Sequence, residues 1–117
     1  MGNLGLVEND VQVLIEMLKR FPHVEQAIVF GSRAKGTFKT GSDVDLALRG
    51  ELLSFEEASR IAYLLNEETS MPYTFDVLQY ETIKSPELVE HIDRVGVVVF
   101  QKHASECSKV LNWRENE

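Results

Sequence analysis

Hydrophobic residues recur along this 117-residue chain with two periods, one typical of helices and one typical of strands. Over residues 10–20 they fall at intervals of three and four, which predicts an amphipathic helix. Ser54 and Glu57 match the capping box, so a second long helix is predicted after Ser54. A third is predicted after Ser85, because Pro86 suits the first helical position.

Strand-like patterns fill the intervals between these helices. They cover residues 25–30, 43–48, 74–79 and 97–100. The first and the last are apolar over most of their length, which is typical of strands covered on both faces. The second alternates, which places Asp43 and Asp45 on one face and the larger apolar side chains on the other.

The order of these elements predicts an α/β (α+β) fold, in which a small mixed sheet of about four strands packs against helices. A short helix, capped by Ser32 and closed by Gly36, is expected between the first two strands. Residues 1–101 form one predicted domain, since 117 residues leave no room for a second core. Residues 102–117 form a polar tail, for which a partner-binding helix and a frayed end both stay open.

Composition narrows the class of protein. With 44% hydrophobic and 26% charged residues, the chain has the make-up of an ordinary globular domain. No apolar run approaches the roughly 20 residues that span a bilayer, and residues 1–10 lack the pattern of a signal peptide. A single cysteine excludes an intrachain disulfide. We therefore expect a cytoplasmic protein that does not associate with membranes.

The distribution of charge indicates what kind of ligand to expect. The net charge of −7 argues against a long nucleic acid, because proteins that bind one in bulk carry a basic surface. Residues 31–42 nevertheless contain Arg33, Lys35 and Lys39 and no acidic side chain. This stretch suits a small phosphorylated ligand, and an ordinary solvated loop is the alternative.

Three aspartates and a Gly-Ser turn together match the needs of a magnesium–triphosphate site. Asp43 and Asp45 lie two residues apart in a strand, which puts both on one face with Cα atoms about 6.5 Å apart. Asp76 stands among apolar strand residues, where aspartate is disfavoured, so we expect it to face the same metal ions. Gly31 and Ser32 follow an apolar strand, where backbone amides can approach phosphates closely.

Each of these features has an ordinary alternative when it is taken alone. An Asp-x-Asp pair is common on surface strands, Gly-Ser is commonly only a turn, and a single aspartate in a strand commonly sits at an edge or in an ion pair. Their order along the chain is the stronger observation. One short helical segment separates the turn from the acidic strand, and one longer helix separates that strand from the third acid.

This order resembles the signature of the polymerase-β-type nucleotidyltransferase superfamily, which is Gly-Ser, ten residues and then Asp-x-Asp, here running from Gly31 to Asp45. Asp76 matches the third aspartate of that family. The short chain, without an added helical domain, is similar to the minimal nucleotidyltransferases, the MNT group. The motifs span residues 27–78, and the element order agrees up to residue 101.

The resemblance implies which residues bind the phosphates of ATP or another nucleoside triphosphate. The amides of Gly31 and Ser32, together with the Ser32 hydroxyl, would hold the β- and γ-phosphates. Arg33 and Lys35 would add positive charge there. The alternative for these two basic residues is that both are exposed side chains on a short helix.

The resemblance also implies the metal ligands. Asp43 and Asp45 would hold two Mg²⁺ ions, and Asp76 would complete the second metal site and help to deprotonate the attacking hydroxyl. That hydroxyl would attack the α-phosphorus in line, and pyrophosphate would leave.

The acceptor is suggested by the same likeness. Minimal members of the family act with a small all-helical protein of the HEPN group as toxin–antitoxin pairs. The resemblance therefore implies that AMP is transferred to a tyrosine of such a partner, which makes this chain the antitoxin. A non-catalytic nucleotide-binding subunit, which regulates its partner by binding alone, is the alternative. A homodimer and a heteromer are both open.

The remaining titratable groups show no pattern of a site. His23, His91 and His103 lack the spacing of metal ligands, so ordinary surface or helix positions are predicted for them. Cys107 lies in the polar tail and is given no nucleophilic role.

Overall fold

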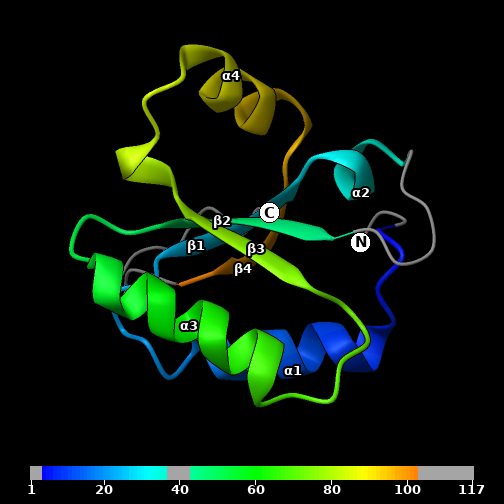
Figure 1. Ribbon diagram of the computed structural model, residues 1–117. Coiled ribbons are helices and arrows are strands. Elements are labelled where there is room, and N and C mark those ends of the chain that lie inside the picture. The colour runs from blue at the N-terminus through cyan, green and yellow to red at the C-terminus, as the bar shows by residue number, and fades with distance from the viewer. Residues whose placement is uncertain (1–3, 37–42, 103–117) are drawn as a thin grey trace, which may run out of the picture.

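One mixed sheet of four strands organises the chain (Figure 1). The computed structural model describes residues 4–36 and 43–102. Its elements in chain order are α1 (Glu8–Leu18), β1 (Gln26–Phe30), α2 (Ser32–Lys35), β2 (Val44–Arg49), α3 (Phe55–Glu67), β3 (Phe75–Gln79), the 3-10 turn η1 (Tyr80–Thr82), α4 (Pro86–Val95) and β4 (Val97–Gln101). The predicted fold class is confirmed, while the interpretation of the tail falls outside the described residues.

The strands run in the order β3-β2-β1-β4. β1 pairs antiparallel with both β2 and β4, whereas β2 and β3 are parallel and are joined through α3. The predicted strands agree with the observed ones to within one residue at each end. α1 lies two residues earlier than predicted at both ends. It ends at Leu18 because the backbone tightens there into a turn, in which Arg20 N donates a hydrogen bond to the Met17 carbonyl.

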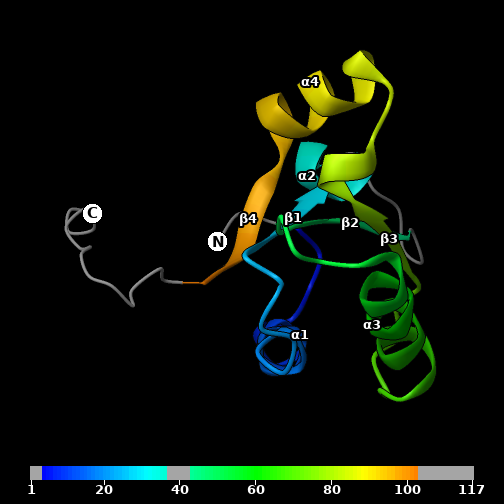
Figure 2. The same ribbon diagram turned by 90° about the vertical axis from the view of Figure 1, so that its left-hand side faces the viewer.

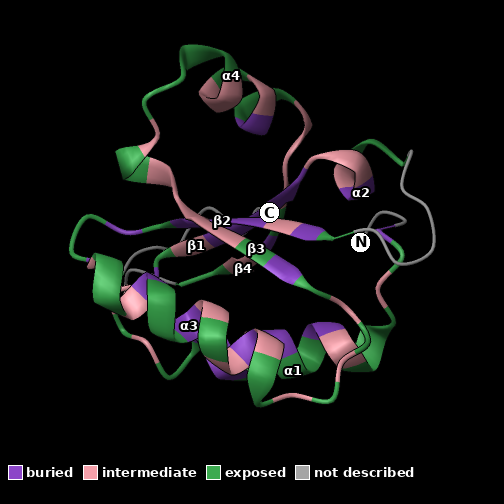
Figure 3. Ribbon diagram, in the orientation of Figure 1, coloured by how far each residue is buried: buried purple, intermediate pink, exposed green. Residues whose placement is uncertain are grey.

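The two faces of the sheet are covered unequally (Figure 2). α1 and α3 pack on one face and bury the larger cluster of apolar side chains, which includes Leu14, Val29, Leu46 and Ile61. α4 lies over the other face and closes a smaller cluster made by Ile28, Phe30, Ala47 and Ile92. This double cover explains why β1 is apolar from Ala27 to Phe30, and these four residues are buried (Figure 3).

The start of α3 tests the predicted capping box, and the prediction is confirmed. The Ser54 hydroxyl accepts from Glu57 N at 3.0 Å, and the Glu57 carboxylate accepts from Ser54 N at 2.9 Å. These bonds satisfy two amides that the first turn of the helix leaves without partners. α3 thereby begins at a fixed residue, and it carries the chain back so that β3 can lie parallel to β2.

Removing this cap gives a first stability prediction. Ser54→Ala should lower the free energy of unfolding by about 1 kcal/mol, because the Glu57 amide loses its acceptor at the helix start. Ser59→Ala is the matched control, since Ser59 is exposed inside the same helix and alanine is the better helix former. Urea unfolding of the two variants measures the difference. Equal stabilities would show that the cap does not hold α3 in place.

Among residues 4–36 and 43–102, no helix is long and apolar enough to cross a membrane.

Candidate functional site

The ends of three strands meet at one edge of the sheet. β1 ends where the antiparallel β2 begins, and β3 begins beside β2 because these two strands are parallel. In this register Asp45 of β2 stands between Phe30 of β1 and Asp76 of β3. Neighbouring strands lie about 4.8 Å apart, so the two carboxylates share a small volume. The predicted juxtaposition of Asp45 and Asp76 is what the strand order produces.

This row of side chains lies on the face of the sheet that α4 covers. Phe30 and Ala47 belong to the smaller cluster together with Ile92 of α4. Asp45 alternates with Val44 and Leu46, which point into the larger cluster, and so has the same direction as Ala47. The predicted alternation along this strand is therefore confirmed.

The electrostatics of the row centre on Asp45. Burial raises the pKa of the Asp45 carboxyl above its ordinary value, the charges of Asp76 and Asp43 raise it further, and His91 acts in the opposite direction. Asp43 and Asp76 are exposed, whereas Asp45 is half-buried. Three carboxylates thus concentrate negative charge at one strand end, and a bound cation would relieve their repulsion.

Gly31 makes the turn that follows β1. Its backbone has φ 75° and ψ −149°, a region that only glycine adopts readily. A Cβ at this position would lie 3.1 Å from Asp45 Cγ and closer still to Asp45 Oδ2. Glycine is therefore required twice, once by the backbone and once by the space that the Asp45 carboxylate occupies.

The start of α2 corrects one prediction. Gly31, not Ser32, is the N-cap residue of this short helix, and Ser32 is its first helical residue. The reason is the extended, positive-φ turn at Gly31, which precedes the first helical residue and has no side chain to form a cap. Gly36 closes the helix in the left-handed conformation, as predicted, with φ 80°.

The two basic residues of α2 differ from each other. Lys35 is exposed. Arg33 is 3% exposed, donates from Nη1 to the Leu4 carbonyl at 2.9 Å, and places its guanidinium over the Tyr73 ring. The alternative in which both side chains are exposed is thus wrong for Arg33, because burial under the N-terminal segment gives it backbone and aromatic contacts. A phosphate-binding role for Arg33 stays a prediction.

The described part of the chain shows no assembled metal site. Within the described ranges, no group of three or more His, Cys, Asp or Glu side chains is arranged to hold a metal ion. Asp43 immediately precedes β2, and its charge raises the pKa of Asp45. The donor set still suits Mg²⁺, which prefers carboxylate oxygens, so a site made by Asp43, Asp45 and Asp76 stays a prediction.

His91 is the residue near this site that sequence reasoning missed. Its Nε2 accepts a hydrogen bond from Gly31 N at 3.2 Å, and its ring meets the Phe30 ring edge to face at a centroid separation of 6.1 Å. The two residues of the hydrogen bond are 60 positions apart. No spacing rule finds such a pair, because it depends on how α4 packs over the sheet.

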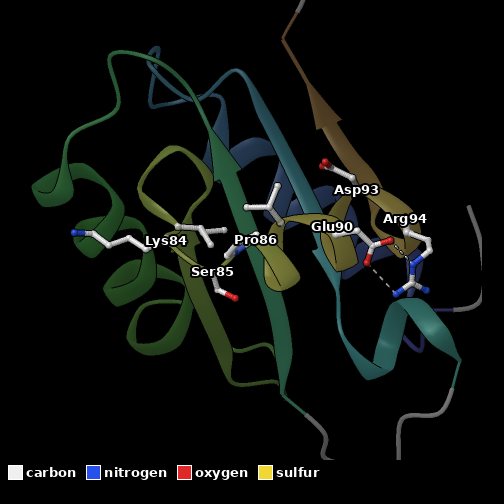
Figure 4. Close-up of a pocket in the computed structure, with 8 residues that line it drawn as sticks. Lys84, Ser85, Pro86, Glu90, Asp93 and Arg94 are labelled. Carbon is white, nitrogen blue, oxygen red and sulfur yellow. Dashed lines mark hydrogen bonds and ion pairs between the residues drawn. The ribbon is translucent and has the colours of Figure 1, made fainter.

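A separate pocket of about 600 Å³ lies beside α4 (Figure 4). Its lining residues are Ile83, Lys84, Ser85, Pro86, Val89, Glu90, Asp93 and Arg94. Within it Arg94 pairs with Glu90 at 2.9 Å. The pocket shares no residue with Asp43, Asp45 and Asp76, which we call the acidic row, so the two are distinct features of the surface.

Comparison with known families gives a match over most of the chain. The profile of the family described as "Polymerase beta, Nucleotidyltransferase" matches residues 12–105. That range contains the Gly31 turn and all three aspartates. A search of curated proteins finds no match.

Solved structures share the fold at low sequence identity. A chain of a toxin–antitoxin complex with AMP-PNP is 18% identical and superposes with a TM-score of 0.65, covering 86% of this chain and 78% of its own. A chain of the complex between the tri-AMPylated HEPN toxin of Shewanella oneidensis and the MNT antitoxin is 16% identical, with a TM-score of 0.62 and coverages of 85% of this chain and 76% of its own. An MntA–HepT toxin–antitoxin complex gives the same identity and TM-score, with coverages of 86% and 77%.

Proposed function

Because the chain belongs to the polymerase-β nucleotidyltransferase family, we propose that it transfers a nucleoside monophosphate, AMP from ATP, to a hydroxyl group. The observation that carries the proposal is the row in which Asp45 and Asp76 are register partners beside the glycine-only turn at Gly31. Two carboxylates and a close backbone turn at one strand end suit metal-assisted transfer at phosphorus.

The residues of the site divide the work of this reaction. Asp43, Asp45 and Asp76 would hold Mg²⁺, two ions by the family resemblance, which supply charge neutralisation for the phosphates and for the leaving pyrophosphate. The Ser32 amide and hydroxyl bind the β- and γ-phosphates. Lys35, which is exposed on α2, adds positive charge to this helix.

Asp76 is the candidate for accepting the proton of the attacking hydroxyl. It is exposed and stands next to Asp45 in the sheet, so an acceptor side chain can reach it from solvent. The hydroxyl oxygen forms a bond to the α-phosphorus as the bond from that phosphorus to the β-phosphate bridging oxygen breaks. Positioning of these groups, rather than covalent chemistry by the protein, accounts for most of the rate.

The acceptor we propose is a tyrosine of a small helical HEPN-type partner. Support comes from the complexes that share this fold, one of which contains AMP-PNP and another an AMPylated HEPN toxin. In this proposal the chain is an antitoxin that modifies its toxin. The acidic net charge of −7 agrees with a protein partner rather than a long nucleic acid.

The competing proposal is a subunit that binds nucleotide and neutralises its partner by contact alone, which the fold shared with chains of toxin–antitoxin complexes also accommodates.

A growth experiment separates the two functions. Expression of the HEPN-type partner alone should arrest growth, and co-expression of the wild-type chain should relieve the arrest. Asp43→Asn should still co-purify with the partner but should lower rescue by at least about 100-fold in colony count, in line with the loss of a group that acts in the transition state. Full rescue by Asp43→Asn would establish neutralisation by binding alone.

A further inference from the structure

We infer that His91 is a positioning residue of the transfer site, which holds the Gly31 turn through its hydrogen bond to the Gly31 amide and so seats the Asp45 carboxylate. The kinetic part of this inference rests on the proposed function. The structural part concerns the Gly31 turn alone and is tested without any turnover. His91 itself touches neither phosphate nor acceptor in this account.

The hydrogen bond fixes both the turn and the state of the imidazole. The Gly31 amide is the donor, so His91 Nε2 is the acceptor and carries no proton, which leaves any proton on Nδ1. The Phe30 ring, one residue before the turn, packs against the imidazole in an edge-to-face pair. Because α4 carries His91, the helix over this face of the sheet is linked directly to the turn.

The Gly31 turn needs an external restraint. Its φ and ψ lie in a sparsely populated region even though glycine tolerates them, and glycine has more conformational freedom to lose than any other residue. α2, which follows it, has only four residues and fixes the turn weakly. Besides the bond that the Gly31 carbonyl accepts from Lys35 N, the structure supplies a side-chain acceptor for the Gly31 amide on a longer, packed helix.

The restraint reaches Asp45 through contact. Asp45 Oδ2 rests directly against the Gly31 Cα, in the space that a side chain would fill at any other residue type. A change in the turn therefore moves the surface on which this carboxylate lies. The Gly31 amide, which the sequence assigned to the phosphates together with Ser32, is engaged by His91. In this account the phosphates are left to the Ser32 amide and hydroxyl, and loss of His91 affects turnover rather than nucleotide binding.

Two substitutions separate the acceptor from the packing of the ring. His91→Phe keeps an aromatic ring against Phe30 and removes the acceptor, whereas His91→Gln places a carbonyl oxygen close to the position of Nε2. A purely space-filling role would therefore tolerate His91→Phe better than His91→Gln, which is the reverse of the order that an acceptor role predicts.

Hydrogen exchange of the Gly31 amide is the direct readout. Phe30-Gly31 is the only Phe-Gly pair in the sequence, so ¹³C-carbonyl phenylalanine with ¹⁵N-glycine isolates this one of the seven glycine amides. His91→Phe should speed its exchange about five- to tenfold, in proportion to the loss of one hydrogen bond. His91→Gln should restore most of the protection. If the Gly31 amide of His91→Phe exchanges as slowly as that of the wild type, the inference is overturned, even if no transfer activity is found in any variant.

Kinetics with ATP and the HEPN-type partner give the second readout. His91→Phe should lower kcat about tenfold with KM for ATP changed less than about twofold, and His91→Gln should recover at least half of the loss on a logarithmic scale. Equal activity of His91→Phe and wild type, or a loss in His91→Gln as large as in His91→Phe, would contradict the acceptor role of His91. Absent transfer by the wild type would count against the proposed function and leave the exchange result to decide the role of His91.

Discussion

Replacing Asp45 with asparagine is expected to raise the stability of the fold at neutral pH while it lowers nucleotidyl transfer by at least about 100-fold. Burial and the neighbouring charges of Asp76 and Asp43 raise the pKa of Asp45, so its ionised form is disfavoured in the folded protein. The neutral amide keeps the shape of the side chain without this cost. The gain should be no more than about 1 kcal/mol, because solvent screens a half-exposed carboxylate.

The pH dependence has a definite sign. A carboxyl whose folded pKa lies above its ordinary value of 3.8 binds more protons in the folded state than in the unfolded state between those two values. The contribution of Asp45 to stability therefore falls as the pH rises from about 3.8 through the raised pKa. Asp45→Asn should lack this fall. Thermal unfolding at a series of pH values measures it.

Glu51→Gln is the control for this experiment, because it removes one negative charge from an exposed turn away from the acidic row. It should leave both stability and transfer close to those of the wild type. Unchanged transfer by Asp45→Asn would show that Asp45 is not part of the site. A destabilised Asp45→Asn would show that the Asp45 carboxylate stabilises the fold despite burial and the repulsion of the neighbouring carboxylates.

Gly31→Ala is expected to abolish transfer and to lower the free energy of unfolding by about 1–3 kcal/mol. The backbone at Gly31 lies in a region that alanine adopts only with strain, and the added methyl group would displace the Asp45 carboxylate. Both effects act on the same turn, so the loss of activity should exceed what reduced stability explains at a temperature where the variant stays folded.

Gly36→Ala is the matched control at the other end of the same helix. Gly36 also has a positive φ, of 80°, but an added Cβ meets nothing within 4 Å. It should cost about 1 kcal/mol of stability with little change in kcat. Comparison of kcat and urea unfolding for the two variants isolates the contact with Asp45. Similar activities in Gly31→Ala and Gly36→Ala would contradict the role given to that contact.

The parts of the fold that follow from local pattern were predictable. Alternation along β2 separates Asp45 from its buried neighbours Val44 and Leu46, and the structure confirms the separation. The capping box of Ser54 and Glu57 fixes the start of α3 from four consecutive residues. These features depend on side chains close together in sequence, so the sequence contains the whole of the signal.

The parts that depend on packing between distant segments were not predictable in the same way. The sequence predicted that Arg33 adds charge at the phosphates, with an exposed side chain as the alternative, and neither reading anticipated that its guanidinium is buried against Leu4 and Tyr73. His91 had no motif, and only the placement of α4 brings its Nε2 to the Gly31 amide. Both arrangements join residues far apart in the sequence, so no local sequence pattern predicts them.

The measurement that tests the central claim most directly compares ATP labelled at the α-phosphate with ATP labelled at the γ-phosphate, each mixed with magnesium, the HEPN-type partner and either wild type or Asp43→Asn. The account predicts that the partner acquires the α-label with wild type only, and acquires no γ-label with either protein. Transfer of the γ-label, or undiminished transfer of the α-label by Asp43→Asn, would contradict nucleotidyl transfer by the aspartates beside the Gly31 turn.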